Sequence, residues 1–168
     1  THASMYTLPV KPSPNLPDMR SIYLYPSTCY FEATPVSLGR GTEHPFQMYG
    51  HTNMKGYDYK FTTRSVPGAK TPPQLNRECY GVDLTKEPSI EEINKKGINL
   101  EYVIDAYRNL NLDDFFFRSF FELLTGRDYI RKMIKAGKSA DEIKAMWADD
   151  VAKFKVQRKP YLLYPDNQ

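Results

Sequence analysis

The amino-acid sequence predicts an α+β fold: a small, mainly antiparallel sheet with long loops in the N-terminal half, packed against three to four helices from the C-terminal half. Three observations support this prediction. Eleven of the 13 prolines lie between Pro9 and Pro88, and none lies between Ser89 and Lys159. Apolar and polar residues alternate in short runs of the first half, as in half-buried strands. In the second half the apolar residues recur at helical spacing instead.

The size and composition fit one ordinary domain. A chain of 168 residues buries roughly 70% of its unfolded surface, which is enough for a core without metal or disulfides. The net charge of +3, from 23 basic and 20 acidic residues, argues against a dedicated nucleic-acid-binding protein. No run of about 18 apolar residues is present to span a membrane. We interpret residues 1–5 as a tag remnant or a cut point inside a longer protein, and residues 6–168 as a single domain.

The proline-rich half is expected to contain extended segments and loops. Residues 11–17 should be extended, because a residue that precedes proline is displaced from the helical region. Four short apolar or alternating runs predict strands. They are residues 22–25, which Pro26 ends, and residues 46–49, 57–63 and 78–84.

The proline-free half is expected to be helical. Leu100, Val103, Ile104 and Tyr107 share one helix face, and the phenylalanines of residues 115–121 predict a short helix that is buried on most sides. A further helix is expected to begin near Thr125 and Asp128, to bury Tyr129, Ile130, Met133 and Ile134, and to end at Gly137.

The last helix has the clearest start signal. Ser139 and Glu142 form the pattern of a capping box. The apolar residues that follow predict one core-facing side, and they are Ile143, Met146, Trp147, Val151 and Phe154. The short turn before this helix predicts a helical hairpin, and residues 161–164 predict a final edge strand.

The cysteines and histidines give no metal-type spacing. Cys29 and Cys79 are predicted to be buried free thiols, with one disulfide or a nucleophilic cysteine as the alternatives. His44 and His51 are seven residues apart and would need a third ligand to hold a metal, so no metal and no cofactor are expected.

The loop of residues 31–46 is the best candidate for a binding site. Gly39 and Gly41 flank Arg40, and this gives the backbone the freedom to present one guanidinium group. Hydroxyls of Ser37 and Thr42 and the carboxylate of Glu32 accompany it in the sequence, a combination that suits a carboxylate or another polar ligand. The alternative is that Glu32 and Arg40 pair with each other and brace the loop.

Tyrosines of the first half are a second candidate. Their rings can line a carbohydrate-binding groove, and they can equally form one face of a sheet. These residues are Tyr23, Tyr25, Tyr49, Tyr57 and Tyr59.

Ordered motifs along nearly the whole chain resemble the second half of the DUF1343 family. They are PSPNLP at 12–17, LYP at 24–26, FEAT at 31–34, GRGT at 39–42, PF at 45–46, CYGVDL at 79–84, INLEY at 98–102 and YLLY at 161–164. Ala33 stands where the family often has Gly, and Gln47 stands where some members have Glu, so no acid role is assigned to Gln47.

The resemblance implies a specific activity for the parent protein. Members look like two-domain exo-β-N-acetylmuramidases, which release N-acetylmuramic acid from the non-reducing ends of peptidoglycan-derived chains in a cleft between the domains. This chain resembles the C-terminal domain, and its implied partners are a Rossmann-like N-terminal domain of the same protein and a peptidoglycan-derived glycan. A periplasmic or extracellular location in a bacterium is also implied.

The resemblance also gives roles to residues of the loop. Arg40 is expected to bind the lactyl carboxylate of N-acetylmuramic acid, and Glu32 to orient Arg40 or to bind sugar hydroxyls, with direct acid–base catalysis as its less favoured role. The other expected substrate-binding residues are Ser37, Gly39, Gly41, Thr42, Tyr49 and His51. The competing hypotheses are a non-catalytic module that binds cell-wall glycans and, ranked far lower, a Cys–His hydrolase.

Overall fold

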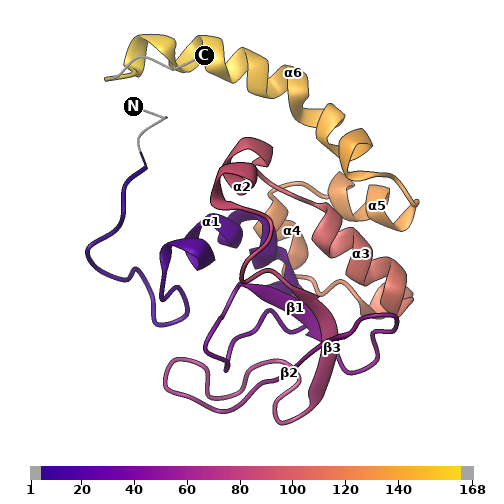
Figure 1. Cartoon of the computed structure of the whole chain (residues 1–168). Coiled ribbons are helices and arrows are strands. Elements are labelled where there is room, and N and C mark those ends of the chain that lie inside the picture. The colour runs from indigo at the N-terminus through magenta and orange to yellow at the C-terminus, as the bar shows by residue number, and fades with distance from the viewer. Residues whose placement is uncertain (1–4, 164–168) are drawn as a thin grey trace.

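The structure is a computed structural model that describes residues 5–163. It confirms the predicted α+β class (Figure 1). A three-stranded antiparallel sheet has the order β1-β3-β2, with β1 at Met48–His51, β2 at Tyr59–Thr62 and β3 at Glu78–Asp83. The three strands fall in segments that the sequence predicted as strands, although β1 begins two residues later than expected.

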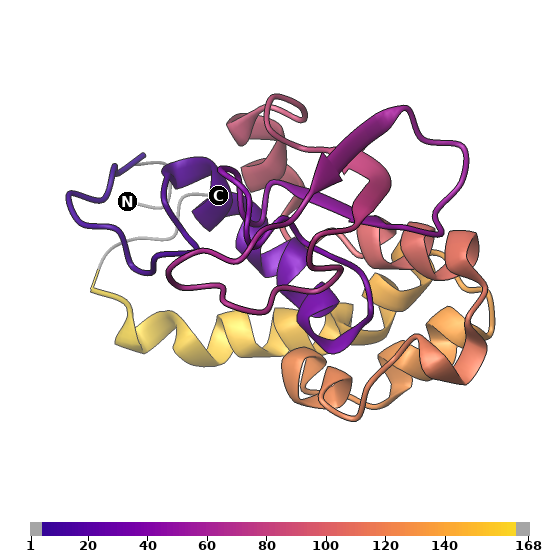
Figure 2. The ribbon, with the colours of Figure 1, turned by 90° about the horizontal axis from the view of Figure 1, so that it is seen from below.

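The described residues also form six α-helices. They are α1 (Met19–Thr28), α2 (Ile90–Lys96), α3 (Glu101–Leu110), α4 (Phe121–Thr125), α5 (Tyr129–Lys135) and α6 (Ala140–Arg158). Three short 3₁₀ helices accompany them, η1 (Cys29–Ala33), η2 (Asp113–Phe115) and η3 (Lys159–Tyr161). Both views place α6 on the side of the molecule farthest from the sheet (Figures 1 and 2).

The strand predicted at residues 22–25 is wrong, because this segment lies inside α1. Asp18 caps the helix: its carboxylate accepts the Ser21 amide hydrogen bond at 2.8 Å, and the Ser21 hydroxyl lies 3.4 Å from the Asp18 amide. Pro26 is accommodated within the last turn of the helix. The Asp-x-x-Ser pattern of a capping box marks this helix start in the sequence, but the apolar run that follows also fits a strand.

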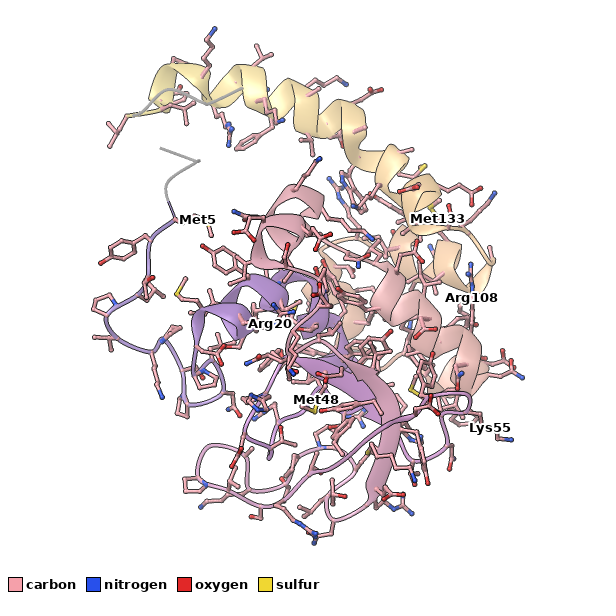
Figure 3. The ribbon with its side chains drawn as sticks, in the orientation of Figure 1. Met5, Arg20, Met48, Lys55, Arg108 and Met133 are labelled. Atoms are coloured by element: carbon pink, nitrogen blue, oxygen red, sulfur yellow. The ribbon has the colours of Figure 1, made fainter. Side chains whose placement is uncertain are left out.

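Helix α2 begins at a second capping box, formed by Ser89 and Glu92. Gly97 follows its last residue with a φ of 63°. The guanidinium group of Arg20, on α1, joins this region to the sheet, because it donates hydrogen bonds to the carbonyls of Leu84 and Pro88 (Figure 3).

The phenylalanine-rich segment differs from the single helix predicted for residues 115–121. Phe115 ends η2 and Phe121 begins α4, with a turn between them. Phe116, Phe117 and Phe121 are buried and stack edge to face, whereas Phe115 is 88% exposed. The aromatic patch therefore supplies core residues from a bend.

Two predictions for the C-terminal segment are wrong. Ile143 is buried, but Met146, Val151 and Phe154 are exposed, so the predicted core-facing side of α6 contacts the core only near its start. Tyr161 ends η3 and Leu162 and Leu163 follow it without strand pairing, while residue 164 of the predicted edge strand lies outside the described residues. The predicted capping box of Ser139 and Glu142 is confirmed.

The core lies between the sheet and helices α1, α3, α4 and α5. It includes Leu24, Phe31, Ile104, Phe121 and Ile134, all less than 2% exposed. The Phe31 ring stacks on Tyr49 of β1 with centroids 4.9 Å apart, and this contact connects the helical side to the sheet. Within residues 5–163, no helix combines the length and the apolar character that crossing a bilayer requires.

Candidate functional site

The loop that carries Arg40 is hydrogen-bonded to β1. Ser37 and Gly50 exchange two backbone hydrogen bonds, of 2.8 and 2.9 Å, and the Phe46 amide donates to the Leu38 carbonyl at 2.7 Å. The loop therefore returns on itself between residues 38 and 46. Met48, at the start of β1, lies in the interior beneath it (Figure 3).

Gly39 and Gly41 are required by the geometry of this loop. Both have left-handed backbone conformations, with φ of 81° and 86°. A Cβ atom on Gly41 would lie 2.3 Å from the Arg64 carbonyl oxygen, and one on Gly39 would lie 2.7 Å from the Met48 side chain. Glycine at these two positions thus allows backbone conformations beside Arg40 that other residues would adopt only with strain.

The structure brings Glu32 and Arg40 together. An Arg40 guanidinium nitrogen lies 3.6 Å from a Glu32 carboxylate oxygen, and the Arg40 and Glu32 side chains are 33% and 26% exposed. A second guanidinium nitrogen makes a long contact of 3.5 Å with the Gly68 carbonyl. The Arg40 Nε is buried and has no hydrogen-bond partner among the described residues. The pair therefore braces the loop and still leaves donor capacity on the guanidinium group.

A pocket of about 290 Å³ opens beside this pair. Tyr25, near the end of α1, and Phe46 form its aromatic wall, with ring centroids 5.1 Å apart. Ser13, Asn15 and Leu16 complete its lining. These three residues belong to the PSPNLP segment, which the sequence marked as a motif but not as part of a site.

Partial burial shifts the pKa of the Glu32 carboxyl. Removal from water raises the pKa of the Glu32 carboxyl above its ordinary value, and the positive charge of Arg40 opposes this rise. Burial also raises the pKa of the Tyr25 hydroxyl, and the nearby Glu32 charge adds to the effect. Because the neighbours withhold water, a charge pair here acts through a lower effective dielectric than at the open surface.

The hydroxyls of Ser37 and Thr42 act inside the loop. Ser37 is fully buried, and its oxygen accepts a bond of 3.3 Å from the Gly39 amide. The Thr42 hydroxyl donates to the Gly39 carbonyl at 2.7 Å and accepts from the His44 amide at 3.1 Å. Both side chains hold the loop in shape, and their predicted contact with substrate stays a prediction.

Tyr49 and His51, on β1, lie outside the pocket lining. Tyr49 is 3% exposed and donates a 2.7 Å hydrogen bond to Asp105, which also accepts one from Tyr57. Burial and this carboxylate strongly raise the pKa of the Tyr49 hydroxyl. His51 is 7% exposed, its Nδ1 accepts from the Asn53 amide, and burial lowers its pKa.

The cysteines are free thiols, as predicted. Cys79 is fully buried and Cys29 is partly buried. Burial raises the pKa of each thiol to about 11. A nucleophilic cysteine needs a lowered pKa, so this environment disfavours the Cys–His hydrolase. In the part of the chain that the structure describes, no three His, Cys, Asp or Glu residues gather in a way that could hold a metal ion.

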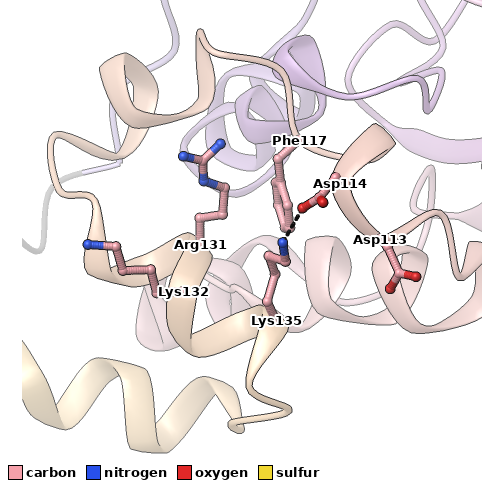
Figure 4. Close-up of a pocket in the computed structure, with 6 residues that line it drawn as sticks. All are labelled: Asp113, Asp114, Phe117, Arg131, Lys132 and Lys135. Atoms are coloured by element: carbon pink, nitrogen blue, oxygen red, sulfur yellow. Dashed lines mark hydrogen bonds and ion pairs between the residues drawn. The ribbon is translucent and has the colours of Figure 1, made fainter.

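Two of the other pockets lie away from the loop of residues 31–46, which is called the motif loop below. One, of about 230 Å³, is lined by charged residues of η2 and α5 that pair with neighbours: Lys135 with Asp114, Lys132 with Asp128, and Arg131 with Glu122 (Figure 4). The other, of about 850 Å³, lies between residues 52–57 and the end of α3 and includes Tyr57 and Tyr80. Of these three, only the motif-loop pocket combines a charged pair, an aromatic wall and an unpartnered buried donor.

Comparison with known proteins gives one consistent result. The family model described as "Exo-beta-N-acetylmuramidase NamZ, C-terminal" matches residues 23–164. The peptidoglycan β-N-acetylmuramidase NamZ of Bacillus subtilis strain 168 is 34% identical over 170 residues, which cover 92% of this chain and 40% of the relative. The crystal structure of a DUF1343 family protein from Bacteroides fragilis NCTC 9343 matches 99% of this chain with a TM-score of 0.95 and 70% identity.

The lengths of these relatives define what the similarity covers. This chain spans 40% of the Bacillus subtilis protein and 47% of the Bacteroides fragilis chain. It therefore corresponds to one part of these longer proteins.

Proposed function

This chain belongs to the family of NamZ C-terminal domains, within a family of peptidoglycan glycoside hydrolases, and from this premise we propose that it forms one wall of the substrate cleft of an exo-β-N-acetylmuramidase. The rest of the parent protein forms the opposite wall and supplies the main catalytic carboxylate. A substrate in the cell wall agrees with the expected periplasmic or extracellular location, which stays a prediction.

The observation that carries the proposal is the environment of Arg40. Its backbone lies between two left-handed glycines, and its guanidinium group is only partly neutralised by Glu32 and borders the 290 Å³ pocket. N-acetylmuramic acid differs from N-acetylglucosamine by a lactyl ether that ends in a carboxylate. A fixed guanidinium group is well suited to bind that carboxylate through charged hydrogen bonds.

The pocket has room for other parts of the sugar. The Tyr25 and Phe46 rings offer an apolar surface to a sugar ring, and Asn15 and Ser13 add polar groups to the lining. Glu32 keeps Arg40 in place and accepts hydrogen bonds from sugar hydroxyls. In this arrangement Arg40 distinguishes muramic acid from glucosamine, and the chemistry of bond cleavage takes place on the other domain.

The first prediction tests Arg40 in the full-length protein. Arg40→Ala should lower kcat/KM on a chromogenic N-acetylmuramide roughly 10- to 100-fold, since a hydrogen bond to a charged group contributes about 1.5–3 kcal/mol. Inhibition by free N-acetylmuramic acid should weaken to a similar extent, and inhibition by N-acetylglucosamine should not change.

The matched control is Arg127→Ala, which removes an exposed arginine between α4 and α5. Equal kinetics for the Arg40 and Arg127 variants would contradict the assignment of the lactyl carboxylate to Arg40. Calorimetry with the isolated chain separates the alternative function, because a self-sufficient glycan-binding module would bind N-acetylmuramic acid without the other domain.

A further inference from the structure

Helix α6 carries an apolar stripe that continues beyond the core. Ile143, Trp147, Val151 and Phe154 follow one another at intervals of four, four and three residues, so they share one side of the helix. Ile143 is fully buried and Trp147 is partly buried. Val151 is 44% exposed and Phe154 is 59% exposed. The side of α6 that begins in the core is thus uncovered over its second half.

The second half of α6 also lacks the packing that stabilises a helix in water. The Lys144 ammonium group donates to the Lys96 carbonyl of α2, and beyond this point α6 runs past the other helices (Figures 1 and 2). From Ala148 to Gln157, every residue is exposed. Isolated helices shorter than about 12–15 residues are only marginally stable in water, so we expect this segment to pack against a partner.

A second uncovered apolar surface lies on the neighbouring helices. A pocket of about 220 Å³ between α1 and α2 is lined by Ile22, Tyr23, Pro26, Ile93 and Ile98 among others, and Ile98 is 41% exposed. Ile98 follows Lys96 by two residues, so this surface adjoins the point where α6 leaves the body. Met5, the first described residue, lies against it and contacts Tyr23 and Asn94 (Figure 3).

The relatives indicate what covers these surfaces. More than half of the Bacteroides fragilis chain lies outside the match, which includes 99% of the present chain at a TM-score of 0.95. The match therefore includes the residues of α6, in a protein about twice as long. The matching family model describes a C-terminal part, so the additional chain of these relatives is N-terminal to the matched part. Met5 lies against the surface of α1 and α2.

We propose that the Trp147–Val151–Phe154 stripe of α6 is the surface on which the N-terminal half of the parent protein docks. That half packs between the stripe and the α1–α2 surface, and it buries apolar area that the present chain leaves in water. This inference rests on family membership and on the exposed stripe, and it does not depend on the role of Arg40. The proline-free half of the chain then contributes to an interdomain interface as well as to the core.

The test compares the full-length protein with the isolated 168-residue chain. Hydrogen exchange of the α6 amides, residues 146–158, should be at least about tenfold slower in the full-length protein, because the docked half prevents fraying. The double variant Val151→Ser and Phe154→Ser should abolish that protection and lower the melting temperature of the full-length protein by several degrees. In the isolated chain the same variant should leave the melting temperature unchanged.

The matched control is Val156→Ser. Val156 is 75% exposed and lies on the opposite side of the helix from Phe154, so its replacement should alter neither exchange nor melting. Equal α6 exchange in the two proteins, or equal effects of the double variant and V156S, would overturn the proposal. A dimer of the isolated chain that the double variant dissociates would assign the stripe to a second copy instead. Unaltered muramidase kinetics in R40A would affect only the proposed function.

Discussion

At the scale of single residues, the environment of the Glu32 carboxyl differs from that of a fully exposed carboxylate and from that of a closely paired one. It is partly withdrawn from water, and its charged neighbour Arg40 is 3.6 Å away. The net effect is a raised pKa, because burial outweighs the attraction of Arg40. The native protein therefore binds the Glu32 proton more tightly than the unfolded chain does.

The second prediction follows from this difference. The contribution of Glu32 to the free energy of unfolding should be greatest at low pH, and it should fall as the pH rises from about 4.5 through the raised pKa, because the unfolded chain loses its proton first. Glu32→Gln should remove this decrease, so its melting temperature should rise relative to that of the wild type as the pH is raised from about 4 to 7. Thermal unfolding across that range measures the effect.

Glu43→Gln, on an exposed carboxylate of the same loop, is the control. Parallel pH profiles for wild type and E32Q would contradict the inferred burial of charge. In the full-length protein E32Q should lower kcat less than about tenfold, whereas loss of a general acid or base would cost about 10²–10⁴. A loss in that larger range would assign the proton transfer to Glu32.

At the scale of elements, the side chain of Asp18 joins the start of α1 to the end of the motif loop. Asp18 caps α1, and its two carboxylate oxygens also accept hydrogen bonds from the Gln47 side-chain amide at 3.0 and 2.8 Å. Gln47 is 2% exposed, and its backbone carbonyl accepts a bond from the Leu84 amide at the end of β3. The helix start, the loop and the sheet therefore meet at Gln47.

The third prediction concerns this junction. Asp18→Ala should lower the free energy of unfolding by about 1 kcal/mol for the lost cap and by a further ~1–3 kcal/mol for the buried Gln47 amide left without an acceptor. Ser139→Ala removes the corresponding cap of α6 without exposing a buried group, so it should cost only about 1 kcal/mol. Equal losses in urea unfolding would show that Gln47 finds another partner.

The elements also show where local sequence signals were sufficient. The Ser139 capping box identified the start of α6, and Gly137, with a φ of 78°, follows α5. The apolar run of residues 22–25 predicts a strand, because β-branched and aromatic residues suit strands, yet the cap at Asp18 and the buried positions Ser21 and Leu24 make the segment helical. A local capping signal and tertiary packing together favoured the helix over the strand.

At the scale of the whole molecule, aromatic side chains connect the helices to the motif loop. Phe121 of α4 is fully buried and its ring centroid lies 6.2 Å from that of Tyr30 in η1, the short helix that also carries Glu32. The Arg118 amide adds a 2.9 Å hydrogen bond to the Ala33 carbonyl. Contacts from the helical half thus hold η1, which carries Glu32, in position.

The fourth prediction compares two phenylalanines of one segment. Phe121→Ala should lower the free energy of unfolding by about 3–5 kcal/mol, because it opens a cavity in the core. Phe115→Ala, at a position 88% exposed, should change it by less than about 0.5 kcal/mol. Similar denaturation midpoints for the two variants would contradict the burial assigned to this bend.

The ordered motifs of the sequence carried the DUF1343 resemblance. Local patterning was enough to predict the fold class, three strand positions, several helix starts and the candidate pair Glu32 and Arg40. These features depend on proline distribution, alternation, capping residues and glycines beside a charged residue. The three-dimensional arrangement was needed to establish that Glu32 and Arg40 lie together beside a pocket, that Ser37 and Thr42 serve the loop, and that the apolar side of α6 is uncovered. Exposure and pairing arise from contacts between segments distant in the chain, and the periodicity of one segment is the same whether its partner is the core or another domain.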